Sequence, residues 1–221
     1  MRRKEFRGEE EGGLSWHALG EGWRYALQRR DLLGTYLIDM NAMFFGVPNA
    51  LFPAFGGVFG NQNIGWLYSA GPAGALLLSL ASGWTSRLRR HGMVIAWAAA
   101  LWGMAIIGFG LSTTLWLALV FLALAGAADM VSGIFRMTLW NQTIPARLRG
   151  RTAAIEMVSY MSGPYLGNAE AGFAARLLGL GTSVVTGGAL CVLGSILITW
   201  ALPEFREYRV LPADRIQSAR L

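Results

Sequence analysis

The chain has 221 residues, of which 54% are hydrophobic and 14% are charged, and its formal net charge is +6. A soluble domain carries about 25% charged residues, so this composition argues against a soluble protein. The single cysteine, Cys191, excludes an internal disulfide and a metal site built from several cysteines. Because the basic residues stand beside apolar runs, we expect the net charge to contact anionic lipid rather than nucleic acid.

Residues 1–30 are predicted to form a cytoplasmic tail and an amphipathic linker helix. The tail has a basic run followed by Glu9, Glu10 and Glu11, and it lacks the apolar stretch of a secretory signal peptide. Between residues 16 and 30, apolar side chains gather on one helical face and charged ones on the opposite face. Such a helix either lies in the membrane interface or packs on the cytoplasmic surface of the protein itself.

Residues 31–203 contain six long apolar segments and are predicted to form an all-α transmembrane domain. About 20 apolar residues suffice to cross the hydrocarbon core, and the runs lack the apolar–polar alternation of a barrel strand. The segments are residues 32–55, 64–84, 93–111, 115–139, 152–178 and 183–202. Residues 204–221 are expected to form a second cytoplasmic tail.

Almost all lysines and arginines lie on one side of these segments, because they occur in the termini and in every second connection. Seven precede the first segment, three lie between the second and third, three between the fourth and fifth, and four follow the sixth. The opposite loops hold none, although Arg176 lies near one of them, and Arg136 is inside a segment. Basic residues remain on the cytoplasmic side, so we expect both termini and both basic loops there. Five tryptophans stand near segment ends, where aromatic belts form: Trp66, Trp84, Trp116, Trp140 and Trp200.

Five ionisable residues fall within the segments: Asp39, Asp129, Arg136, Glu156 and Glu170. A charge that faces lipid is costly, so each is expected to face protein or a water-filled cavity. One interpretation is that the carboxylates carry protons or contact a transported substrate. The other is structural: Arg136 and Glu156, at similar depth, form an interhelical ion pair, and Glu170 reaches interfacial water or pairs with Arg176.

Helical periodicity arranges these groups in two polar stripes. Asp129, Ser132 and Arg136 share one face of the fourth segment. One face of the fifth segment carries Glu156, Tyr160, Gly163, Gly167 and Glu170. The GxxxG spacing of the two glycines favours a close helix contact, and the two stripes predict a shared interior surface.

The sequence contains none of the common motifs of catalysis or cofactor binding. HExxH, Cys-x-x-Cys, Walker A and GxSxG are all missing from it. We therefore predict neither an enzyme, nor a bound metal, nor a cofactor.

Two cytoplasmic loops resemble those of the major facilitator superfamily. The loop after the second segment has the glycine and the arginines of the superfamily motif, with Ser86 at its acidic position: Gly83, Arg87, Arg89 and Arg90. The next loop carries Arg149, Gly150 and Arg151. With Gly163-Pro164-x-x-Gly167, residues 39–53 and residues 202–208, these loops make the chain similar to the bacterial enterobactin-export and multidrug-efflux branch.

This resemblance implies one six-helix half of a twelve-helix transporter, made of two inverted three-helix repeats. It implies a multi-pass protein of the bacterial inner membrane that exports a siderophore or an amphipathic drug, coupled to proton antiport. The chain is similar to the C-terminal half alone, so a truncated gene, a separately encoded N-terminal half and a second copy of the chain remain open. The alternative is a membrane scaffold or assembly protein that does not transport, and solute accumulation in vesicles separates the two.

Overall fold

The computed structural model describes residues 24–25, 27–145 and 148–209, and none of them forms a strand. The predicted tail and linker helix lie mostly outside these residues; residues 24, 25, 27 and 28 of that helix are helical. The remaining elements are α2 (Arg30–Phe45), η1 (Asn49–Leu51), α3 (Phe52–Phe59), η2 (Asn61–Asn63), α4 (Ile64–Leu80), η3 (Ser82–Arg87), α5 (His91–Gly110), α6 (Leu115–Thr143), α7 (Arg149–Leu178), α8 (Leu180–Ala201) and α9 (Pro203–Arg206).

Four helical stretches are long and apolar enough to cross a membrane: Arg30–Phe59, His91–Gly110, Leu115–Thr143 and Leu180–Ala201. Two of the six predicted segments do not meet that description. The helix α4 has only 17 residues, and α7, with 30 residues, is the least apolar of the long helices. Length and composition of the helices therefore confirm a helical protein with apolar spans, but they do not confirm the count of six.

The first predicted segment is a broken helix. α2 ends at Phe45, and the chain resumes helical structure at Asn49. Pro48 lacks a backbone N–H and disfavours helical geometry at the residue before it. The carbonyl of Gly46 loses its helical partner there and accepts a hydrogen bond of 3.0 Å from Nε1 of Trp102. The side chain on α5 thus satisfies a backbone group that lipid could not.

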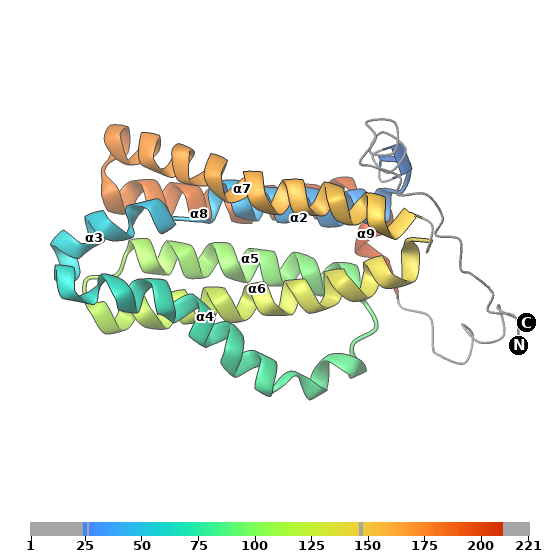
Figure 1. Ribbon diagram of the computed structural model, residues 1–221, viewed down its shortest axis with the longest axis horizontal. Coiled ribbons are helices and arrows are strands. Elements are labelled where there is room, and N and C mark those ends of the chain that lie inside the picture. The colour runs from blue at the N-terminus through green and yellow to red at the C-terminus, as the bar shows by residue number, and fades with distance from the viewer. Residues whose placement is uncertain (1–23, 26, 146–147, 210–221) are drawn as a thin grey trace, which may run out of the picture.

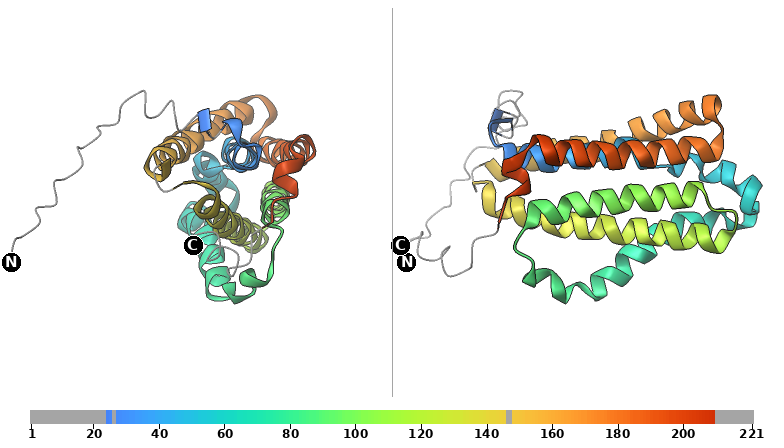
Figure 2. Two further views of the ribbon diagram at one scale, coloured as in Figure 1. Left: turned by 90° about the vertical axis from the view of Figure 1, so that its right-hand side faces the viewer. Right: turned by 180° about the vertical axis from the view of Figure 1, so that it is seen from behind.

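The long helices form two layers (Figures 1 and 2). One layer contains α2, α7 and α8, and the other contains α4, α5 and α6. Toward its C-terminal end, α4 diverges from α6 (Figure 1). There the large side chains of α4 are exposed: Leu76, Leu77 and Leu80.

One end of the bundle gathers the segments that the sequence analysis assigned to the cytoplasm. It holds the start of α2, the connection from η3 to α5, the start of α7 and the short helix α9 (Figure 1). We call it the basic end, because Arg29, Arg30, Arg89, Arg90 and Arg149 lie on these segments.

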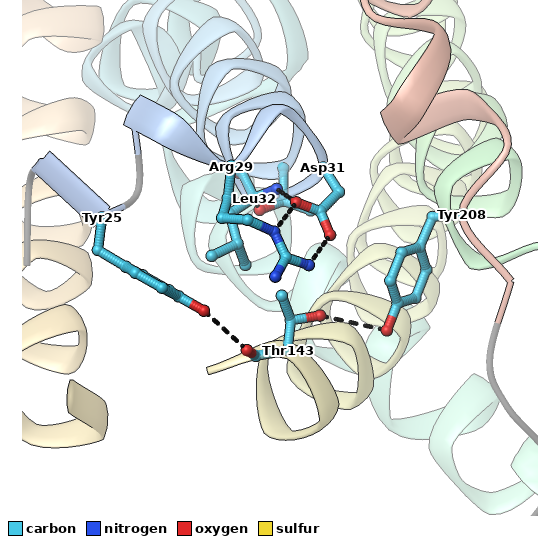
Figure 3. Close-up of polar contacts among 7 residues, drawn as sticks. Tyr25, Arg29, Asp31, Leu32, Thr143 and Tyr208 are labelled. Carbon is cyan, nitrogen blue, oxygen red and sulfur yellow. Dashed lines mark hydrogen bonds and ion pairs between the residues drawn. The ribbon is translucent and has the colours of Figure 1, made fainter. Parts of the chain in front are cut away.

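Polar contacts tie three segments together at the basic end (Figure 3). The hydroxyl of Tyr25 donates to the carbonyl of Thr143 at 3.0 Å, and Oγ1 of Thr143 donates to the hydroxyl of Tyr208 at 3.2 Å. Arg29 and Asp31 form an ion pair of 2.6 Å beside them. Phe205 of α9 is fully buried. Residues 204–208, predicted as part of a tail, therefore pack onto the bundle.

Glycines allow several pairs of helices to approach closely. A Cβ added to Gly126 of α6 would overlap the carbonyl oxygen of Gly71 on α4. The predicted GxxxG pair also makes a helix contact: Gly163 faces the side chain of Met43 on α2, and a Cβ on Gly167 would overlap the carbonyl oxygen of Met43. Close packing of this kind stabilises helix association in lipid, where the hydrophobic effect does not drive it.

The α4–α6 contact can be tested with a matched pair of substitutions on α6. Gly126→Ala inserts a methyl group against backbone and should destabilise the bundle by about 1–3 kcal/mol. Gly133→Ala meets open space, so helix propensity alone should make it neutral or stabilising by up to about 1 kcal/mol. Melting temperatures in the same detergent check both. Equal melting temperatures for the two variants would contradict the close contact.

Candidate functional site

A buried ion pair joins α2 to α6. Nη1 of Arg136 contacts Oδ1 of Asp39, and the two side chains are only 11% and 14% exposed. Nε of Arg136 has no hydrogen-bond partner within the described residues. The predicted pairing of Arg136 with Glu156 is therefore corrected, because α2 rather than α7 supplies the bonded carboxylate. Periodicity gives the depth of Arg136 and its helix face, but not the helix that lies opposite.

Glu156 lies near this pair without bonding to it. It is close enough to Arg136 and Tyr36 for electrostatic interaction with both. No hydrogen bond or ion pair involves its carboxylate among the residues that the structure describes, and its side chain is half-buried. Glu156 therefore remains an acidic group free to meet a proton or a ligand.

A cavity of about 140 Å³ opens beside Glu156, between α2, α6 and α7. Its lining residues are Tyr36, Met137, Trp140, Asn141, Ile144, Arg149, Thr152, Ala153 and Glu156. The cavity lies toward the basic end, since α6 ends at Thr143 and α7 begins at Arg149. Apolar walls with a few polar groups are typical of small-molecule sites.

An aromatic pair forms part of the cavity wall. The rings of Tyr36 and Trp140 stack with centroids 5.3 Å apart and an interplanar angle of 22°. Nε1 of Trp140 donates a hydrogen bond of 2.9 Å to Oγ1 of Thr35, which itself donates to the carbonyl of Leu32. Because Trp140 is buried and bonded at its nitrogen, the position of the aromatic wall is fixed before any ligand arrives.

Arg149 lines the cavity, but its guanidinium is engaged elsewhere. Nη2 donates to the carbonyl of Asn141 at 3.1 Å, and Nε donates to the carbonyl of Ile144 at 3.4 Å. These are carbonyls at the C-terminal end of α6 and just beyond it, where a cation complements the negative end of the helix dipole. Its contacts thus give Arg149 a capping role.

Asp129 lies apart from the cavity, further from the basic end. Its side chain is exposed and has no hydrogen bond or ion pair within the described residues. Gly126, one turn earlier, touches α4, whereas Gly133, one turn later, meets open space. Asp129 is thus an unpaired carboxylate at the point where α4 leaves α6.

The other predicted site residues are dispersed. Glu170 is half-buried on α7 and makes no ion pair with Arg176, both residues being in the described part. Gly83 belongs to η3, Arg89 and Arg90 are exposed, and Gly150 follows Arg149 in α7. The side chains of Arg87 and Arg151 lie outside what the structure describes. The structure thus brings together four of the predicted residues: Asp39, Arg136, Glu156 and Arg149. Asp129, Glu170 and the loop that follows α4 lie away from them.

Sequence reasoning missed the aromatic residues of the cavity. Residue type alone gives no reason to select Tyr36, and the position of Trp140 near a segment end predicts an interfacial belt, whereas the structure buries Trp140. Trp66, Trp116 and Trp200 are exposed, as a belt requires; the side chain of Trp84 is outside the described set. A signal existed in the spacing, because Tyr36 and Trp140 each lie one turn from a member of the Asp39–Arg136 pair on the side of the basic end.

Comparison with known proteins finds relatives among bacterial exporters. The chain is 29% identical over 156 residues to the enterobactin exporter EntS of Escherichia coli (strain SMS-3-5 / SECEC), covering 70% of this chain and 37% of that exporter. It is 29% identical over 150 residues to EntS of Shigella flexneri, covering 67% and 36%. No family model and no solved structure matches the chain. The resemblance to major facilitator exporters is confirmed, and the chain spans a little over a third of these relatives' length.

Neutralising one member of the ion pair should destabilise the bundle. Asp39→Asn leaves the charge of Arg136 buried and uncompensated, so we expect a loss of about 3–5 kcal/mol. Asp39→Asn with Arg136→Gln removes both charges and should recover part of that loss. Thermal unfolding in detergent measures all variants.

The matched control is Glu204→Gln, which breaks the exposed pair of Arg30 and Glu204 at 3.1 Å. That loss should stay below about 1 kcal/mol. If Asp39→Asn costs no more than this control, the pair is not buried in the native bundle.

Proposed function

We propose that this homologue of major facilitator exporters is the C-terminal half of a proton-coupled efflux transporter for a siderophore or an amphipathic drug. A transporter role is supported by the exporters it matches. The proposed half is supported by coverage, since the matched region is 37% of the E. coli relative. The complementary six helices would come from an N-terminal half or from a second copy of the chain.

The observation that carries the proposal is the set of three acidic groups within the apolar helices, of which Glu156 borders the cavity. Asp39 is held by Arg136, Glu156 borders the cavity, and Asp129 is exposed without a partner. In lipid, an unpaired carboxylate is costly unless water or protein reaches it. We therefore infer that these groups meet a water-filled pathway, where carboxylates can bind and release protons.

We assign the two remaining membrane crossings to α4 and α7. With η2 and η3, α4 lies in a nearly continuous helical run from residue 61 to residue 87. α7 has 30 residues, or about 45 Å at 1.5 Å per residue. The lower hydrophobicity of α7 follows if one face of this helix meets the complementary half instead of lipid. Six crossings then form the two inverted three-helix repeats, with both termini in the cytoplasm of a bacterium and the bundle in its inner membrane.

The orientation can be tested with single cysteines in a Cys191→Ser background. Asn61→Cys lies at the end opposite the basic end and should react with an impermeant thiol reagent added to intact cells. Arg89→Cys lies at the basic end and should react only after the cells are permeabilised. The reverse pattern would overturn the proposed topology.

Proton coupling is tested at Asp129, which has no bond whose loss would unfold the bundle. In proteoliposomes that contain the chain with its complementary half, Asp129→Asn should reduce solute uptake driven by a pH gradient at least tenfold, a loss equivalent to about 1.4 kcal/mol. Asp39→Asn should also reduce it, but stability must be measured in parallel. Glu204→Gln is the control and should transport normally.

The chain reconstituted without its complementary half should not transport. Unchanged uptake in both aspartate variants at equal protein levels would reject coupling through these residues. Efflux by the chain as a stable monomer would reject the proposed half-transporter.

A further inference from the structure

We propose that the cavity between α2, α6 and α7 binds the cationic head of an organic ammonium ligand. The inference rests on the proposed function, because it assigns a substrate class to the transporter's own wall. Three features carry it: the size of the cavity, its aromatic wall and the sign of its uncommitted charge.

The size of the cavity suits a single small head group. Its volume is about 140 Å³, close to the roughly 150 Å³ of an engineered cavity that holds benzene. A trimethylammonium group or one aromatic ring therefore fills it. A longer apolar tail of the ligand must extend through the open side, as an amphipathic molecule allows.

The aromatic wall favours a cation over a neutral group of the same shape. Tyr36 and Trp140 both line the cavity and stack on each other. Stacking covers one face of each ring, and an ammonium group placed against a remaining face would be attracted by the negative electrostatic potential of that face. The bond from Trp140 to Thr35 holds the wall in place, so little ordering is needed when the ligand binds.

The cavity lining carries one cation, Arg149, and one anion, Glu156, so the preference depends on which of the two is free to contact a ligand. Arg136 is paired with Asp39, and Arg149 donates to carbonyls of Asn141 and Ile144. Glu156 alone among the charged groups lining the cavity has no bond within the described residues. An ammonium head therefore gains a carboxylate partner, whereas a catecholate or carboxylate ligand meets repulsion from Glu156.

Binding to the full chain in lipid nanodiscs tests the inference with three probes of similar size. Benzyltrimethylammonium is the cation, neopentylbenzene is its neutral isostere, and 2,3-dihydroxybenzoate is an aromatic anion. Titration followed by ligand-observed NMR should show saturable binding of the cation. The cation should bind about tenfold or more tightly than either other probe, a difference of about 1.4 kcal/mol. Equal or tighter binding of the neutral or anionic probe would overturn the inference, and this comparison needs no variant.

Substitutions then locate the site. Glu156→Gln should weaken cation binding about tenfold and remove the preference over the isostere, whereas Glu156→Asp should keep that preference. Tyr36→Leu should weaken the cation about threefold to tenfold through loss of ring surface. Glu207→Gln, on an exposed side chain of the basic end, should leave binding unchanged. Unaltered binding in Glu156→Gln would place the cation elsewhere and refute the assignment.

The outcome separates this inference from the proposed function. Cation binding without transport in the assembled protein would count against the efflux proposal alone. Transport of solutes without any preference for the cation at this cavity would count against the cation site alone.

Discussion

The need to neutralise a buried charge constrains how the two layers of helices meet. Arg136 belongs to the layer of α4, α5 and α6, and Asp39 belongs to the layer of α2, α7 and α8. Their ion pair joins the layers with both side chains almost fully buried. A buried pair of this kind contributes little net stability compared with apolar packing, but breaking it is expensive. It therefore acts mainly on specificity, by excluding arrangements of the layers in which either charge is left alone.

That constraint extends to the cavity. α2 leaves the basic end and α6 returns to it, so one turn toward the basic end from Asp39 is Tyr36, and from Arg136 it is Trp140. Once the charges are paired, the two aromatic rings lie opposite each other, and they stack. Glu156 from α7 closes the third side. The ion pair sets the register of α2 against α6, and the aromatic wall depends on that register.

Some helix pairs of the bundle pack closely, whereas other helix surfaces are exposed. Glycines allow close contact of α4 with α6 and of α7 with α2. The C-terminal end of α4 nevertheless diverges from α6, and the leucines of α4 are exposed there. Exposed leucines suit lipid, whereas the exposed Asp129 on α6 does not. The relatives are exporters more than twice as long as the matched region. The unpaired Asp129 and the length of the relatives both support the proposed complementary half.

The sequence by itself determined the membrane class, the helical content and the end of the bundle that carries the basic loops. These follow from composition and from apolar length, which act locally along the chain. It also predicted the glycine contact of Gly163 and Gly167, because helical period fixes which residues share a face, and it located the five ionisable groups within the apolar segments. Pro48 stands inside an apolar run, whose length alone predicts one continuous segment, whereas the structure breaks the helix there.

Only the tertiary structure decided which charges pair, which aromatic residues line a cavity and which helix ends diverge. Glu156 and Asp39 are both acidic groups on the half of an apolar segment nearer the basic end, and nothing in their spacing tells which one lies across from Arg136. That choice depends on how α2 and α7 pack. Gly163 and Gly167 of α7 contribute to this packing through their contact with Met43 of α2. Trp140 likewise stands near a helix end, as an interfacial residue does, but the approach of Thr35 and Tyr36 from α2 buries it. Partner choice between helices depends on contacts more than 100 residues apart in sequence, and local patterns do not contain them.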